Sequence, residues 1–196
     1  MAQHHIHHTQ GIILSSKNRG EANKMLLIYT RELGLVRAAV QGVRHNRSKL
    51  RYALQDFSYA NIDLVRGKEI WRVTSAAPIN SFAFIRSDKE KFLLMARLFS
   101  LVERLCAGEE AAERVWDALR QALSLLDSPE FSKDSIHALE LHTVLSIVYE
   151  LGYIGESELL SDYLGKDFAD EHVFQILQNR KSIISHINKA LRESQL

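Results

Sequence analysis

Short apolar runs separated by polar turns fill the first part of the chain. Residues 58–65 alternate between apolar and polar side chains, and residues 70–75 repeat the alternation after the turn Arg66-Gly67-Lys68. A period of two is typical of a strand with one buried face. Three further apolar runs complete the set, at residues 11–15, 24–30 and 35–40. Five short strands joined by glycine turns predict a small closed barrel such as the OB-fold.

The period changes to that of helices after Pro78. Ser87 and Glu90 have the spacing of a capping box, which predicts a helix start at Ser87 and an end at Gly108. Residues 134–151 are apolar around most of the helix, as expected for the centre of a bundle, and Gly152 follows as its C′ residue. Other helices are predicted at residues 109–126, 156–164 and 171–192. The fold class is therefore α+β, with a five-stranded OB-fold barrel domain over residues 1–80 and an all-α helical bundle domain over residues 81–196.

The net charge of +1 hides two oppositely charged parts. Residues 1–80 hold 12 of the 25 Lys and Arg residues but only 5 of the 24 acids, a balance of +7. The remaining 13 bases and 19 acids give the second part −6. A basic domain of this kind favours a polyanion as partner, because affinity for nucleic acid grows with the number of phosphates neutralised. The alternative is that the two halves attract each other.

The densest cluster of cations lies between the third and fourth predicted strands. Residues 44–51 carry four cations within eight residues, with polar side chains between them and no helical apolar stripe. Such a loop can place guanidinium and ammonium groups along a phosphate backbone. A solvated charged loop without a partner is the alternative interpretation.

With these features the sequence resembles the RecO family of recombination mediators. The matching segments are Gly11-Ile12-Ile13-Leu14, Gly20-Glu21-Ala22-Asn23-Lys24, Tyr29-Thr30-Arg31-Glu32-Leu33-Gly34, Gly42-x-Arg44-x-x-x-Ser48-x-Leu50 and Leu54-Gln55-Asp56-Phe57. The stretch from Leu139-Glu140-Leu141 to Leu151-Gly152-Tyr153 is similar to the family's central helix. The similarity is dense over residues 10–82, looser over 83–153 and faint beyond.

The resemblance implies a DNA repair and recombination protein that binds single- and double-stranded DNA and anneals complementary strands. It also implies two partners, RecR and single-strand-binding protein, and indirectly RecA, which such proteins help to load. The positions carried over as DNA contacts are Arg44, Arg47, Ser48 and Lys49 in the loop, with Lys24 and Arg31 on neighbouring strands. Charge alone adds Lys17, Arg19, Arg37 and Arg51.

No cofactor or metal is predicted. Many family members carry zinc-binding cysteines after the central helix, but Tyr153-Ile154-Gly155-Glu156 continues here without one. The imidazoles of His4, His5, His7 and His8 are of a type that binds transition metals, yet a defined site near a chain end is not expected. A single cysteine and the lack of a long uncharged apolar run favour a cytoplasmic protein without a membrane segment, and the resemblance implies that it associates with the nucleoid.

An enzyme is not predicted. Cys106 is expected to be an inert thiol on the apolar face of a helix, and no glycine-rich phosphate loop occurs. Two other classes stay open. One is an OB-fold factor that binds RNA. The other is a protein adaptor whose barrel never contacts nucleic acid and whose acidic helices dock a basic partner through Glu109, Glu110, Glu113 and Asp117.

Overall fold

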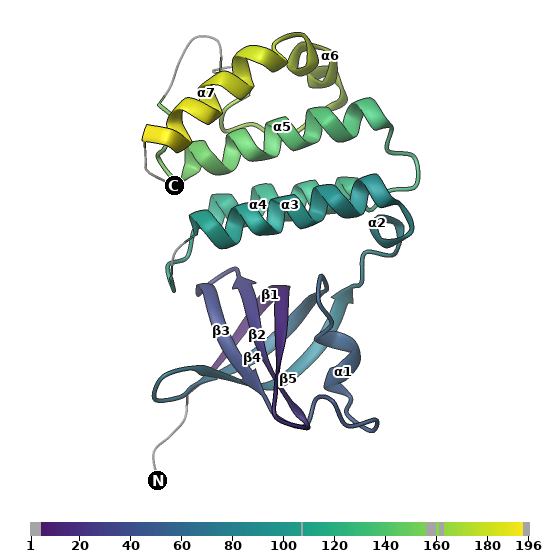
Figure 1. The fold of residues 1–196 in the computed structure, drawn as a ribbon, viewed down its shortest axis with the longest axis vertical. Coiled ribbons are helices and arrows are strands. Elements are labelled where there is room, and N and C mark those ends of the chain that lie inside the picture. The colour runs from purple at the N-terminus through teal and green to yellow at the C-terminus, as the bar shows by residue number, and fades with distance from the viewer. Residues whose placement is uncertain (1–4, 107, 156–159, 161–162, 194–196) are drawn as a thin grey trace. The chain divides into compact units, whose positions relative to one another are not determined.

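The computed structural model describes residues 5–106, 108–155, 160 and 163–193 (Figure 1). The chain divides into two compact units. The first comprises Met1–Phe82 together with Cys106–Ala111, and the second comprises Ala83–Leu105 with Ala112–Leu196. None of the helices in the described part of the chain is long and apolar enough to cross a membrane.

Five strands form a closed barrel in the order β1-β2-β3-β5-β4. The pairing of β1 with both β2 and β4 closes the barrel, and β3 meets β5 as the single parallel pair of the ladder. A four-residue helix, α1 (Leu50–Ala53), connects β3 to β4. The bounds are β1 (Ile6–Arg19), β2 (Asn23–Thr30), β3 (Gly34–Val40), β4 (Tyr59–Arg66) and β5 (Trp71–Asn80). The five-stranded barrel followed by helices confirms the predicted fold class.

The barrel core follows the alternation of the strands. On β3, Val36, Ala38 and Val40 point inward and are fully buried, whereas Arg37 between them is exposed. Ile28 on β2 and Trp71 on β5 belong to the same core cluster. The burial of these apolar side chains is the main stabilising contribution to the barrel. Because successive strand residues face opposite sides, the charged residues between them are directed outward.

Strand β1 is longer than its apolar run predicted. It begins at Ile6 rather than Gly11, because residues 6–12 pair with β4 before the strand turns to pair with β2. A register shift between Ile13 and Ser15 accompanies that change of partner. The polar start of the strand is held by the ladder and by a 2.6 Å contact between His8 Nδ1 and Asp63 Oδ1.

The second unit contains only helices among its described elements. Their bounds are α2 (Ala83–Ser87), α3 (Lys89–Leu105), α4 (Glu113–Leu126), α5 (Lys133–Glu150), α6 (Asp170–Gln178) and α7 (Arg180–Glu193). Helix α5 contacts α3, α4, α6 and α7, which confirms that residues 134–151 form the buried centre of a bundle. Gly152 has a φ of +77°, as expected for its C′ position.

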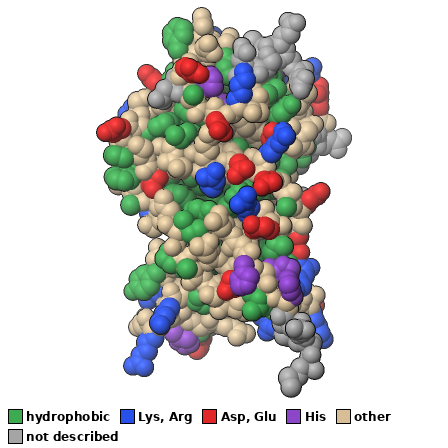
Figure 2. Space-filling view, turned by 180° about the vertical axis from the view of Figure 1, so that it is seen from behind, with side chains coloured by type: hydrophobic (Ala, Val, Ile, Leu, Met, Phe, Trp, Pro, Cys, Tyr) green, Lys and Arg blue, Asp and Glu red, His purple; other side chains and the backbone are tan. Residues whose placement is uncertain are grey.

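The surface of this unit carries both signs of charge. Arg97 pairs with Glu140, Lys133 with Glu90, and Arg114 with Glu150. On the face drawn in Figure 2, acidic and basic side chains are correspondingly interspersed.

Two helix predictions need correction. Ser87 is the last residue of α2 and does not cap α3, because its hydroxyl donates to the Phe84 carbonyl. The carboxylate of Asp88 caps α3 instead and accepts from the amides of Glu90 and Lys91. The hydrogen bond from Lys91 lowers the pKa of Asp88, as expected for a capping carboxylate. The single helix predicted over residues 171–192 is two helices, which meet at Asn179. Of the predicted helix over 156–164, residues 156–159 and 161–162 lie outside the described residues.

The segment between α3 and α4 packs on the barrel. The amide of Leu35 donates to the carbonyl of Gly108 at 3.1 Å, and Glu110 lies over Gly34. Helix α4 therefore begins at Glu113 instead of residue 109, and Glu109 and Glu110 do not lie on it. Cys106 is buried, but it lies just beyond the end of α3 and not on a helical face. Burial raises the pKa of its thiol and that of the Tyr29 hydroxyl nearby.

Candidate nucleic-acid interface

A row of side chains crosses the outer face of four strands. Lys17 on β1 is opposite Met25 on β2, Met25 is opposite Ala39 on β3, and Ala39 is opposite Arg72 on β5. Lys17 and Arg72 are exposed, and the two residues between them are half-buried and apolar. In the neighbouring row, Arg37 on β3 is opposite Leu27 on β2. Three cations thus lie on one outward face, around a shallow apolar floor.

Two turns border this face. A groove of about 650 Å³ runs between the β1–β2 turn and the β4–β5 turn. The first border contributes Arg19 and Asn23, and the second contributes Lys68 and Glu69. In an OB-fold, oligonucleotides bind on the face of strands 2 and 3 between these same two turns. The groove therefore combines the position typical of nucleic-acid binding with three lining cations, Arg19, Lys68 and Arg72. Lys17 and Arg37 lie on the same outward face and bring the number of cations there to five.

These five cations are available to a polyanion. Among the described residues no carboxylate forms an ion pair with any of them, although Glu69 lies at the border of the groove. The nearby Arg66 differs, because it pairs with Glu109 and its guanidinium lies 4.9 Å from the centre of the Trp71 ring. The groove thus carries a net positive charge.

A second cationic surface lies beside α1. Lys24, Arg44 and Arg51 line a pocket of about 350 Å³ together with the amide side chains of Asn46 and Gln55. The apolar residues Val43 and Leu54 form its remaining wall. No carboxylate lines this pocket, so it is suited to an anion.

Short-range hydrogen bonds shape the loop that carries Arg44. Gly42 has a φ of +63°, and its amide donates to Asn23 Oδ1 at 2.9 Å. The Arg44 amide donates to the carbonyl of Ala22 at 3.0 Å, and its Nη1 donates to the carbonyl of Gly20 at 2.9 Å. The loop is therefore fixed against the β1–β2 turn, with part of the Arg44 guanidinium left toward solvent.

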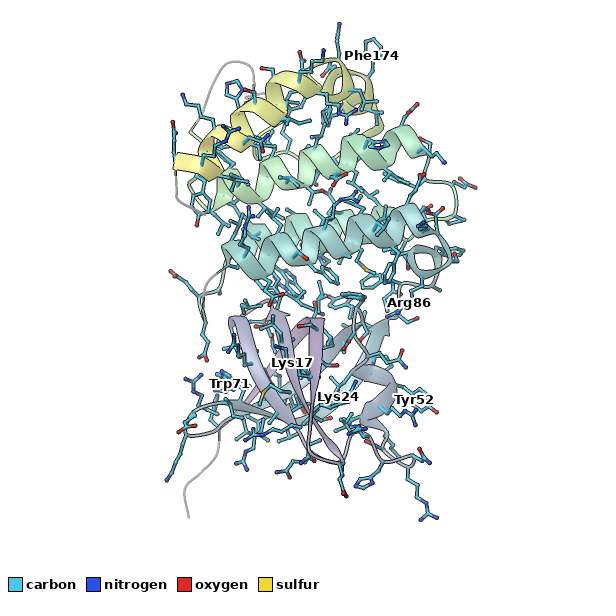
Figure 3. All side chains as sticks on the ribbon, in the orientation of Figure 1. Lys17, Lys24, Tyr52, Trp71, Arg86 and Phe174 are labelled. Carbon is cyan, nitrogen blue, oxygen red and sulfur yellow. The ribbon has the colours of Figure 1, made fainter. Side chains whose placement is uncertain are left out.

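All the predicted positions except Arg31 fall into three places. Arg19 lines the groove and Arg37 lies on the same outward face, while Lys24, Arg44 and Arg51 line the α1 pocket. Arg47, Ser48 and Lys49 lie in the loop just before α1, with the two cations exposed. Figure 3 shows Lys17 and Lys24 on neighbouring strands, with Tyr52 on α1.

Arg31 lies apart from the other predicted positions. It follows the last residue of β2, whereas Lys24 is near the first residue. Seven residues of extended chain separate the two by roughly 23 Å. The structure therefore brings Arg31 to neither the groove nor the α1 pocket.

Lys68 and Arg72 were not among the predicted DNA contacts. The alternation of residues 70–75 already predicted that Arg72 points to the other face of the strand from the buried Trp71 and Val73. The turn Arg66-Gly67-Lys68 was predicted as well. What the pattern did not show is that this turn borders the same groove as Arg19. That juxtaposition depends on barrel closure and not on local sequence.

Three aromatic residues of the barrel unit differ in their availability for base stacking. Trp71 is only 4% exposed, and the ring of His7 packs edge-on against it at 5.0 Å. Tyr59 is half-buried, and its hydroxyl donates to Gln10 Oε1 at 2.5 Å. Tyr52 on α1 is 72% exposed. Of these three, only Tyr52 offers a ring face to a ligand.

The histidines at the start of the chain are used in the barrel. His7 packs on Trp71 and His8 contacts Asp63, while His4 lies outside the described residues. Within the described part of the chain, no group of three or more histidine, cysteine, aspartate or glutamate residues is arranged to hold a metal ion.

Comparisons with known proteins identify a family that matches the part of the chain that forms the barrel. Residues 1–82 match the family described as "Recombination protein O N terminal". The protein named "DNA repair protein RecO" from Alkaliphilus metalliredigens is 30% identical over 134 residues, covering 68% of this chain and 54% of the relative. That from Heliobacterium modesticaldum is 33% identical over 108 residues, 55% and 40% of the two chains. That from Dehalococcoides mccartyi is 30% identical over 142 residues, 72% and 56%. The chain spans about half the length of these curated relatives.

Proposed function

The chain belongs to the RecO family of DNA repair proteins, and from this premise we propose that its barrel binds DNA in recombination and repair. The observation that carries the proposal is the row from Lys17 to Arg72 across the outer face of the barrel. It lies between the two turns that border the oligonucleotide site of OB-folds.

Binding is electrostatic in this proposal. Five cations lie in the groove or on the same outward face, Lys17, Arg19, Arg37, Lys68 and Arg72, and each can neutralise one phosphate. Release of counterions from a single strand gives a slope of about −0.7 in log K against log salt for each phosphate. Engagement of all five therefore predicts a slope of about −3.5.

The protein acts as a mediator, and no bond is made or broken. Neutralised phosphates lower the repulsion between complementary strands, which promotes their annealing. By analogy with the family, the chain binds single- and double-stranded DNA and works with RecR. It then assists the loading of RecA onto DNA covered by single-strand-binding protein. These partners imply a place at the nucleoid.

The test is a salt titration of binding combined with a strand-annealing assay. Labelled single-stranded DNA should bind the wild-type chain with the slope given above, and an RNA of the same length should compete less well. A variant with Arg44, Arg47 and Lys49 changed to Ala should anneal more slowly than the wild type. A salt slope near zero would exclude the electrostatic mechanism, and equal competition by RNA would favour an RNA-binding factor.

A further inference from the structure

The groove and the α1 pocket lie on opposite sides of the same hairpin. Asn23 lines the groove, whereas the next residue, Lys24, lines the α1 pocket. Both belong to β2, where successive side chains point to opposite faces. Lys24 Nζ donates to Ser16 Oγ at 3.1 Å, which holds its ammonium group on the pocket side. The barrel thus has two cationic surfaces, which lie on opposite sides of β2.

The α1 pocket has a composition suited to a nucleotide. Lys24, Arg44 and Arg51 supply positive charge for phosphate, and the amides of Asn46 and Gln55 can donate to and accept from base edges. Arg51 Nη1 donates to Asn46 Oδ1 at 3.3 Å, which keeps both groups at the same wall. The absence of a carboxylate from the lining leaves this charge uncompensated within the pocket.

Tyr52 adds an exposed aromatic ring on the same short helix that carries Arg51. It follows Arg51 directly in α1, and 72% of it is exposed although the next two residues, Ala53 and Leu54, are buried in the barrel core. A large exposed aromatic ring on a short helix anchored by its other face is placed to stack on an unpaired base. A base within a duplex offers no free face to such a ring.

We propose that the α1 pocket with Tyr52 is a second site, selective for single-stranded DNA, so that one barrel holds two DNA strands at once. The inference rests on the proposed function and deepens it. The groove follows one phosphate backbone, and the α1 pocket holds a second strand through phosphate contacts and stacking. Two strands held on opposite sides of the β1–β2 hairpin are kept within one molecule, which raises their effective concentration for annealing.

The first experiment compares Tyr52→Ala with the wild type on a single strand and on a duplex of the same length. Loss of one stacked base should weaken single-strand binding about five- to a hundredfold. Duplex affinity should not change, and it also reports that the barrel remains folded. Tyr52→Phe keeps the ring and should restore single-strand binding. Phe174→Ala is the matched control, because Phe174 is an equally exposed aromatic residue on α6 of the helical unit.

The second experiment counts bound strands by calorimetry with oligothymidylate of about eight nucleotides, a length within the site size of one OB-fold. The wild type should bind two oligonucleotides per chain, and either Arg51→Glu or Arg72→Glu should reduce this to one. A single site in the wild type overturns the proposal, as does unchanged single-strand affinity in Tyr52→Ala. In both cases the proposed function survives. A wild type that binds no DNA overturns both together.

Discussion

Arg44 Nη1 donates a 2.9 Å hydrogen bond to the carbonyl of Gly20, which joins the loop after β3 to the turn between β1 and β2. The Arg44 amide also donates a hydrogen bond to the Ala22 carbonyl in the same turn. One arginine therefore both positions the loop and supplies charge to the α1 pocket. Its two roles can be separated by mutation.

Arg44→Ala is expected to weaken single-stranded DNA binding at the α1 pocket and to reduce the salt slope of binding at that site by about 0.7, the value of one phosphate contact. The loop should also lose its side-chain anchor, so the affinity is expected to fall more than loss of charge alone predicts. Arg44→Lys should keep the salt slope while losing part of the affinity. Fluorescence anisotropy at several salt concentrations measures both quantities. Arg180→Ala, at an exposed arginine of α7, is the control and should behave as the wild type.

Charge reversal in the groove should have a larger effect. Arg72→Glu places a carboxylate in the row opposite Ala39, where it repels phosphate and removes one cation. We expect at least a tenfold loss of affinity for both single- and double-stranded DNA at about 50 mM salt, decreasing toward about 200 mM salt because of screening. Arg180→Glu makes the same charge change in the helical unit. If the two variants lose equal affinity, the groove is not the binding surface.

A pair of glycines should separate backbone strain from steric clash. Gly20 and Gly34 both have a φ of +66°, but a Cβ at Gly20 meets nothing within 4 Å. At Gly34 the same atom would lie 2.3 Å from the Glu110 carbonyl oxygen. Gly20→Ala should lower the free energy of unfolding by about 1–2 kcal/mol through strain alone. Gly34→Ala should cost about 1–3 kcal/mol more, because the segment over it must move. Urea unfolding curves measure the difference, and equal losses would show that the segment yields freely.

His142 should make the stability of the chain depend on pH. It is buried in α5, its ring lies edge-on to Phe168 at 5.5 Å, and burial, followed by the nearby His172, lowers its pKa to about 4. The unfolded histidine has a pKa of about 6.5 and binds more protons between about pH 4 and about pH 6.5. Stability is therefore complete above about pH 6.5 and falls as the pH decreases to about 4, by up to roughly 3 kcal/mol.

The measurement is the free energy of unfolding in urea across this pH range. His142→Asn removes the titrating ring and should flatten the dependence, even if the variant is less stable at neutral pH. His137→Asn is the control, because His137 is exposed on the same helix and should leave the dependence unchanged. A wild-type slope that persists in His142→Asn would assign the effect to other groups.

The strands were predictable where one face is apolar and the other polar. Residues 58–65 and 70–75 alternate clearly because β4 and β5 each bury one face in the barrel. The start of β1 was missed because His7 and His8 carry no such alternation, and their strand conformation comes from pairing with Leu64 and Asp63. Tertiary pairing decides the structure of such a polar segment, and the local sequence does not contain it.

The candidate site was predictable only in part. The cation cluster in the loop is visible in the sequence, since it is local. The union of Arg19 with Lys68 and Arg72 depends on closure of the barrel, which joins residues about 50 positions apart. The prediction that Ser87 caps a helix was wrong for a similar reason. Ser87 and Asp88 both have side chains that can cap a helix, and only the end of α2 decides that Asp88 takes this role.

The peptide that covers Gly34 has a consequence for fragments of the protein. A fragment ending at Phe82 contains all five strands but lacks the carbonyl that accepts from the Leu35 amide. It would also lack Cys106, which lies beside the Tyr29 hydroxyl, and Glu110, which lies over Gly34 in the β2–β3 turn. We therefore expect this fragment to be less stable than a barrel that keeps residues 106–111. A barrel fragment for crystallisation or binding studies should therefore include residues 106–111, joined to Phe82 by a short linker.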